Sequence, residues 1–176
     1  PGGYSESYTW DSYGRPSAQT VTADGTSYSI NQTYYTTTGQ LAALQYPTST
    51  SGYRLRVRYE YSNNLLRQVH DYNSSAVFWE ALTTDAFGHV KDETFGNGVR
   101  TITRFDPASG RMEAREAGLG GGSGLINAAT TWDLNGNLST RQDLNQSLTE
   151  SFVYDSLDRL DSGQRMVPRP AKDALS

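Results

Sequence analysis

The sequence predicts an all-β protein made of antiparallel β-hairpin repeats stacked along one direction. Three observations predict this fold class. A short turn motif recurs seven times, strand-like alternation separates its copies, and no window of eleven or more residues shows helical periodicity. Because each repeat of such a protein packs mainly against its neighbours, we expect a strip of strands rather than one thick core.

The repeated motif runs aromatic, Asp, two variable positions, Gly, a polar residue and an aliphatic residue. The clearest copies are WDLNGNL at 132–138 and YDSLDRL at 154–160. The other copies are WDSYGRP at 10–16, YTTTGQL at 35–41, YSNNLL at 61–66, TDAFGHV at 84–90 and FDPASGRM at 105–112. The first residues of the seven copies span 144 residues in six steps, a mean spacing of 24. We therefore predict one repeat domain over 1–162, with a flexible tail or linker at 163–176.

The motif residues are those that a tight turn between two strands requires. An Asp after the last strand residue can accept hydrogen bonds from backbone N–H groups of the turn. The Gly supplies the positive φ that closes the hairpin, and Asn64 and Asp158 replace it in two copies because Asn and Asp tolerate that conformation next best. The predicted structural residues are Trp10, Asp11, Gly14, Tyr35, Gly39, Tyr61, Asp85, Gly88, Phe105, Asp106, Gly110, Trp132, Asp133, Gly136, Tyr154, Asp155 and Asp158.

The segments between the motifs predict further strands and loops. Tyr and aliphatic residues alternate with Arg and Glu over 53–61, as in a half-buried strand. Asn97-Gly98 lies between two strand-like segments and predicts a hairpin turn. The glycine run GLGGGSG at 118–124 has no phosphate-loop context, and we interpret it as a flexible loop between two repeats.

Composition narrows the possible partners. The chain has a net charge of −4, which does not favour binding to nucleic acid or to anionic lipid. It has no cysteine, and no stretch approaches the length of a membrane span. Twelve tyrosines and a mean hydropathy of −0.65 suit half-buried strands better than an oily core. The chain does not open on a signal peptide, and we expect both ends to be cuts within a longer protein.

The motifs WDLNGNL, YDSLDRL and FDPASGRM resemble the YD repeats of RHS proteins, and the stretch 95–112 is especially similar. The resemblance spans residues 8–162. It implies a β-strip that spirals into a hollow shell, or part of one, enclosing a C-terminal toxin domain in polymorphic bacterial toxins. Related teneurin-like shells serve adhesion in animals, and some members are described as carbohydrate-binding. Nothing after Leu160 resembles the self-cleaving region that often ends the family's shells.

The resemblance implies a secreted or surface-exposed bacterial protein whose partners are the remainder of the parent chain and an enclosed toxin domain. We expect no catalytic centre, no cofactor and no metal, since a spacing near 24 separates the motif aspartates. His70 and His89 lie in different repeats, which does not favour a zinc site or a catalytic triad. No pairing pattern among Asp and Glu indicates a glycan-cleaving enzyme, which is the least favoured alternative.

The sequence offers one basic cluster, at Arg54, Arg56, Arg58 and Arg67. It could bind an acidic glycan or an acidic protein face, or it could be a solvated strand face that discourages aggregation. Exposed tyrosine rings could likewise stack on sugars or pack between repeats. A carbohydrate- or surface-binding module is therefore the alternative function, and exposed strand edges predict self-association at high concentration.

Overall fold

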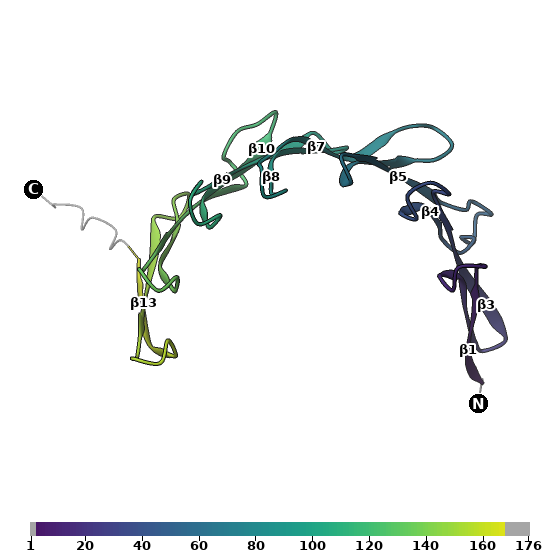
Figure 1. Cartoon of the computed structure of the whole chain (residues 1–176), viewed down its shortest axis with the longest axis horizontal. Helices are drawn as coiled ribbons and strands as arrows, with labels where there is room; N and C mark the ends of the chain where they lie inside the picture. Colours follow the sequence, from purple (N-terminus) through teal and green to yellow (C-terminus); the bar gives the residue numbers. More distant parts are fainter. Residues whose placement is uncertain (1–2, 168–176) are drawn as a thin grey trace, which may run out of the picture. The chain divides into compact units, whose positions relative to one another are not determined.

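The structure, a computed structural model, describes residues 3–167 as fourteen β-strands and no helix, which confirms the all-β antiparallel prediction (Figure 1). The strands are β1 (Tyr4–Trp10), β2 (Pro16–Ala23), β3 (Thr26–Tyr34), β4 (Leu41–Gln45), β5 (Arg56–Ser62), β6 (Leu65–Asp71), β7 (Val77–Thr84), β8 (Val90–Phe95), β9 (Val99–Phe105), β10 (Met112–Leu119), β11 (Ile126–Trp132), β12 (Leu138–Asp143), β13 (Leu148–Tyr154) and β14 (Leu160–Met166). Their order in the sheet is their order in the sequence. Within the described residues, no helix has the length and hydropathy needed to cross a membrane.

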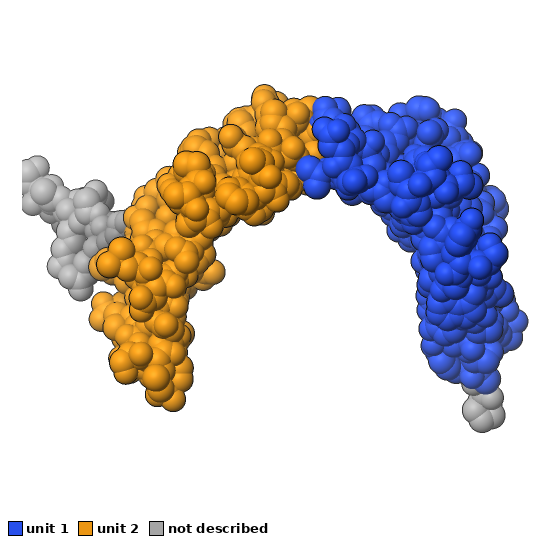
Figure 2. Space-filling view, in the orientation of Figure 1, with its two compact units in different colours: residues 1–80 blue, residues 81–176 orange. Residues whose placement is uncertain are grey.

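The chain divides into two compact units, with the boundary inside β7 between Glu80 and Ala81 (Figure 2). Unit 1 contains β1 to β6 and the first half of β7. Unit 2 contains the second half of β7 and β8 to β14. In each unit the strands form a single layer (Figure 1). Contacts between elements join strands that are neighbours in the sheet.

Consecutive strands run in opposite directions, so in each unit the turns after odd-numbered strands lie along one edge of the strand layer and the others along the opposite edge. Each of the seven motifs connects an odd-numbered strand to the next strand. The motif turns of a unit therefore line up along a single edge, which we call the motif edge.

The single layer leaves little space for a core. The buried hydrophobic residues among those described are small: Ala43, Val57, Ala81 and Ala117. No large side chain in this part of the chain is fully buried, whereas Tyr13, Phe87 and Leu157, at three of the motif turns, are 79%, 65% and 69% exposed. Most globular domains pack two layers around their core. Here the apolar area shared between adjacent strands replaces that core.

Cross-strand side-chain pairs also stabilise the strand layer. In unit 1, Thr20 pairs with Ser29 through hydroxyls 2.8 Å apart on β2 and β3. In unit 2, Arg141 on β12 contacts Glu150 on β13, with Nη2 and Oε2 at 2.6 Å. Such pairs each contribute about 0.2–1 kcal/mol, and they accumulate along a strip of strands.

Three predictions about the segments between motifs need correction. The strand predicted over 53–61 begins only at Arg56, because Tyr53 belongs to a loop in which Ser49 N–H donates to Tyr53 O at 2.8 Å. The loop predicted at 118–124 starts too early, because Gly118 and Leu119 belong to β10, with Gly118 buried. The predicted tail starts too early, because 163–166 belong to β14, while 168–176 lie outside the described residues. The turn predicted at Asn97-Gly98 is confirmed between β8 and β9.

Candidate functional site

Four of the seven motif turns share one hydrogen-bonding pattern, seen most fully at 133–137. Asp133 N–H donates to Asn137 O at 2.9 Å, and Gly136 N–H donates to Asp133 O at 3.1 Å. Asp133 Oδ1 also accepts from the N–H groups of Gly136 and Asn137, both at 2.8 Å. Gly136 has a φ of 96°, in the left-handed region that favours glycine. The motif thus encodes a tight turn closed by a left-handed residue.

The turns that begin at Asp11, Asp85 and Asp155 repeat this pattern. In each, the Asp N–H donates to the carbonyl four residues later, and its Oδ1 accepts from the N–H groups two and four residues later. The left-handed positions are occupied by Gly14, Gly88 and Asp158. Asp158 adopts a φ of 58° there, at the position where the sequence substitutes Asp for Gly.

In four of the five motif carboxylates, Oδ2 binds the side chain that follows the left-handed residue. Arg15 Nη2 lies 2.6 Å from Asp11 Oδ2, and Arg159 Nη2 lies 2.7 Å from Asp155 Oδ2. The Arg159 side chain, helped by the Arg159 and Leu157 N–H groups, holds the pKa of Asp155 below its usual value. The Asn137 N–H and amide, with the Gly136 N–H, do the same to the pKa of Asp133.

The motif at 35–41 must be realigned by one residue. Gly39 N–H donates to Tyr35 O at 2.9 Å, just as Gly110 N–H donates to Asp106 O at 2.8 Å. Tyr35 therefore stands at the Asp position, and Tyr34 is the motif aromatic. The sequence contained a sign of this, because YYTTTGQL at 34–41 has the same length as FDPASGRM at 105–112.

The motif at 61–66 closes by a shorter turn. Ser62 pairs with Leu65, and the two residues between them, Asn63 and Asn64, have φ values of 50° and 63°. Two successive left-handed residues are typical of a two-residue hairpin that matches the twist of its strands. Tyr61 stays at the aromatic position, at a register shift between Glu60 and Tyr61.

We call the residue after each left-handed position the clasp residue, and in three motifs it contacts the aromatic residue of the next motif. The Arg15 guanidinium lies over the Tyr34 ring at 4.2 Å from its centre. The His89 ring stacks on Phe105 with centroids 4.6 Å apart. Arg111 lies 6.0 Å from the centre of the Trp132 ring. Cation–π and ring stacking of this kind stabilise by about 0.5–1.5 kcal/mol per contact.

The clasp residues also reach the left-handed residue of the next turn. Gln40 Nε2 donates to Asn64 O at 3.2 Å, and Asn137 Nδ2 donates to Asp158 Oδ1 at 2.8 Å. A Cβ atom at Gly110 would lie 3.2 Å from His89 Cε1. Glycine is thus favoured at this position both by its φ and by the side chain arriving from the preceding repeat. The sequence marked the clasp position only as polar, which does not reveal a contact about 24 residues away.

The aromatic residues are also tied to the preceding repeat through their polar atoms. Tyr34 OH donates to Pro16 O at 2.7 Å, and Trp132 Nε1–H donates to Met112 O at 2.7 Å. Pro16 and Met112 occupy the same motif position, the first strand residue after the turn. Tyr34 and Trp132 therefore each join two repeats through both the ring face and the polar edge.

The four arginines proposed as a basic cluster are each engaged within the protein. Arg56 lies over the Tyr72 ring at 3.6 Å, and Arg54 Nε donates to Tyr46 O at 2.8 Å. Arg67 Nη2 lies 3.2 Å from Glu80 Oε1. Arg58 Nε lies 3.5 Å from Glu60 Oε1, and its guanidinium binds the Tyr35 hydroxyl, which raises the pKa of Arg58. Of the four, Arg58 alone lines a hollow among those described below.

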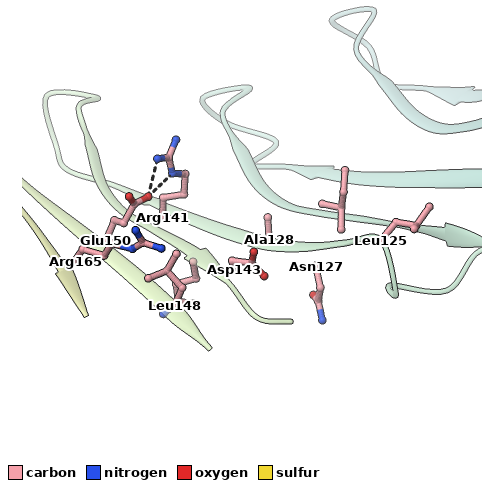
Figure 3. Close-up of a pocket in the computed structure, with 10 residues that line it drawn as sticks. Leu125, Asn127, Ala128, Arg141, Asp143, Leu148, Glu150 and Arg165 are labelled. Atoms are coloured by element: carbon pink, nitrogen blue, oxygen red, sulfur yellow. Dashed lines mark hydrogen bonds and ion pairs between the residues drawn. The ribbon is translucent and has the colours of Figure 1, made fainter. Parts of the chain in front are cut away.

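Several hollows lie on the strand layers of the described residues, and two of them bear on the predicted site. One, of about 280 Å³ in unit 1, is lined by Tyr35, Thr37, Thr38, Gln40, Arg58, Glu60 and Tyr61. The other, of about 410 Å³ in unit 2, lies on β11 to β14 (Figure 3). Figure 3 shows the ion pair of Arg141 and Glu150 near Arg165 at one end, with Leu125 at the other. Both hollows are shallow and open to solvent.

The two histidines each pair with one carboxylate. His70 Nε2 lies 3.2 Å from Glu60 Oε1, and His89 Nδ1 lies 2.9 Å from Asp85 Oδ2. These two pairs belong to different units. Across residues 3–167, no group of three or more His, Cys, Asp or Glu side chains is placed to hold a metal ion.

The motif aspartates predict that the protein loses stability in acid. The pKa values of Asp133 and Asp155 are lower in the folded chain, so their contribution is complete above the unfolded value of about 3.9 and is lost as the pH falls through the folded values. We expect the urea midpoint to be constant above about pH 5 and to fall below about pH 4. Asp133→Asn keeps an acceptor oxygen but does not titrate, and should show a shallower fall. Equal slopes for both proteins would contradict this role for Asp133.

No protein-family model and no curated protein matches the sequence. Solved structures do match. The crystal structure of TcdB2-TccC3 is similar with a TM-score of 0.71 and 16% identity, over 86% of this chain and 9% of that chain. That of TcdB2-TccC3-Cdc42 has a TM-score of 0.69 and 16% identity, over 86% and 9%. The chain spans only about a tenth of the length of these structures. It shares the fold of a segment of the TcdB2-TccC3 chain.

Proposed function

We propose that this chain is a non-catalytic structural segment of a bacterial RHS/YD-repeat shell. Its partners are then the remainder of a parent chain and a toxin or effector domain that the shell encloses or presents. The parent would be secreted or exposed on the cell surface. One observation supports this most strongly: a single layer of strands, matched over 86% of its length by a much larger toxin-complex chain.

The chemistry of the repeat supports a structural role. The motif aspartates hold turns, and the clasp residues and motif aromatics join one repeat to the next. These conspicuous residues are thereby occupied by contacts within the chain. A single layer also has two open faces, and a wall needs one face toward its contents and one toward solvent.

The test is a cryo-electron microscopy reconstruction of the full-length parent polypeptide. We expect the strand layer of 3–167 to continue into flanking strands and to form part of the wall of a closed shell with density inside. A parent in which these strands form an isolated, open module would contradict the proposal.

A second candidate function is carbohydrate binding at the hollow of unit 1. Tyr35 and Tyr61 form an edge-to-face pair with ring centroids 6.2 Å apart. Arg58 and Glu60 lie beside them, 3.5 Å apart at their nearest charged atoms. An aromatic surface next to paired donors and acceptors suits the faces and hydroxyls of a sugar ring. A volume of about 280 Å³ could admit one sugar unit.

A glycan array followed by titration calorimetry tests this candidate. Binding that is lost in Tyr61→Ala but kept in Tyr28→Ala would support it, because Tyr28 is an exposed tyrosine outside the hollow. Binding to no glycan, or equal binding by both variants, would overturn it.

A further inference from the structure

Two asparagine–glycine pairs lie in turns of unit 2, and their surroundings differ. Asn97-Gly98 lies between β8 and β9, and Asn135-Gly136 lies in the motif turn between β11 and β12. Asn loses its side-chain amide most readily before Gly, because the backbone nitrogen that follows can approach the amide carbon without hindrance from a Cβ atom. The reaction is intramolecular, so the local hydrogen bonds decide which of the two pairs reacts.

The Asn135-Gly136 pair is held at both reacting groups. The Gly136 N–H donates to the carbonyl oxygen of Asp133 at 3.1 Å and to its Oδ1 at 2.8 Å, so attack would require removing a proton from beside a carboxylate. The leaving amide is also engaged, because Asn135 Nδ2 donates to Asp158 Oδ1 at 3.0 Å. An added Cβ at Gly136 would overlap the Arg111 guanidinium, which therefore lies against this turn.

The Asn97-Gly98 pair has neither restraint. The turn at 96–98 is exposed, and the Gly98 N–H donates to one neutral acceptor, Phe95 O at 2.9 Å. The Asn97 amide nitrogen has no hydrogen-bond acceptor among the residues that the structure describes. Opening of this exposed turn therefore frees the Gly98 nitrogen without breaking a contact to a charged group.

The Asn97 side chain is also oriented for the reaction. Its Oδ1 accepts a hydrogen bond from the Val99 N–H at 3.1 Å, which folds the side chain back along the backbone toward the residue after Gly98. The same N–H withdraws charge from the amide carbonyl. When the Gly98 nitrogen adds to Cγ, negative charge develops on Oδ1, and a donor that is already in place stabilises it.

We propose that Asn97 is a site of deamidation in the folded chain, whereas Asn135 is protected. The Gly98 nitrogen gives up its proton and bonds to Asn97 Cγ. The bond from Cγ to Nδ2 breaks, and the proton leaves with that nitrogen as ammonia. Water then opens the resulting cyclic imide at either carbonyl, which produces aspartate or isoaspartate. One water is consumed and one ammonia is released, and no oxidant or reductant takes part.

The two products differ in their effect on the strand layer. Aspartate keeps an oxygen for the Val99 N–H and adds a negative charge. Isoaspartate adds a carbon to the backbone between residues 97 and 98, which displaces Gly98 O from the Gly120 N–H, its donor at 3.1 Å. The turn follows an even-numbered strand and so lies on the edge opposite the motif edge. Deamidation therefore alters that edge with time and leaves the motif turns unchanged.

Peptide mapping of the full chain tests this proposal, because trypsin separates the two pairs. Cleavage after Lys and Arg places Asn97 in the peptide 92–100 and Asn135 in the peptide 116–141. The chain is held at neutral pH and physiological temperature for several weeks, and mass spectrometry measures the amide converted to carboxyl in each peptide. We expect several-fold more conversion at Asn97 than at Asn135. A portion digested without incubation corrects for conversion during the digest.

A second portion, incubated in guanidinium chloride, shows whether the fold sets the difference. Both sites are Asn-Gly pairs, so the unfolded chain should convert at Asn97 and at Asn135 to similar extents. Equal conversion in the folded chain, including none at either site, or an excess at Asn135 would overturn the proposal. A difference that persists unchanged in guanidinium chloride would also overturn it, because the hydrogen bonds of the fold would then not be its cause. These outcomes are independent of whether a parent chain forms a shell.

Discussion

Trp132→Ala should lower the free energy of unfolding by about 2–3 kcal/mol, less than the loss for a fully buried Trp because this side chain is 37% exposed. The substitution removes the ring under Arg111 and the donor to Met112 O. It thus removes two contacts that join neighbouring repeats at the motif edge. Urea unfolding followed by far-UV circular dichroism measures the effect.

The chain contains a matched control at the same motif position. Trp10→Ala should cost less than about 1 kcal/mol, because Trp10 is 60% exposed and lacks a clasp residue from a preceding described repeat. Leu134→Ala should change little, since Leu134 is fully exposed only two residues from Trp132. Equal losses for Trp10→Ala and Trp132→Ala would show that the clasp does not stabilise the strip.

Gly118→Ala should be the most destabilising of the conservative glycine substitutions. A Cβ atom at this position would lie 2.3 Å from Gly122 O, a backbone atom that cannot rotate away. Gly118 is buried in β10, and the loop that returns to β11 passes over it. Relieving the overlap requires moving this loop, at a cost of about 1–3 kcal/mol.

The control for this prediction is Gly124→Ala in the same glycine run. An added Cβ at Gly124 meets no atom within 4 Å. The urea midpoint of the Gly124→Ala variant should match that of the unchanged protein. If the two alanine variants unfold together, the close approach of 118 and 122 does not contribute to the stability of unit 2.

The all-β fold and the turns were predictable because their causes are local. Asp and Gly at fixed spacing specify a hairpin turn, and alternation specifies strands. The choice between Tyr34 and Tyr35 as the motif aromatic could not be predicted from the sequence, because either tyrosine satisfies an aromatic position. The hydrogen bond of Tyr34 to Pro16 decides it, and that bond depends on the neighbouring strand.

The interactions between repeats could not be predicted either, because they join residues that are far apart in the sequence. Arg56 looked solvated by alternation, yet its guanidinium lies over the Tyr72 ring, 16 positions along the chain. The composition of the glycine run predicted a flexible loop. At position 118, however, only glycine leaves room for the backbone oxygen of Gly122. In both places, a backbone or side chain brought in by pairing determines what the residue does.

Within each unit, the position of the motif turns on one edge limits how such a gene can change in length. Duplicating or deleting two adjacent strands with their motif, about 24 residues, keeps the later turns of that unit on the same edge. Gain or loss of a single strand would reverse all strands that follow and move their turns to the opposite edge. Recombination among repeats is therefore tolerated in steps of one hairpin, and the number of strands between any two motifs stays even.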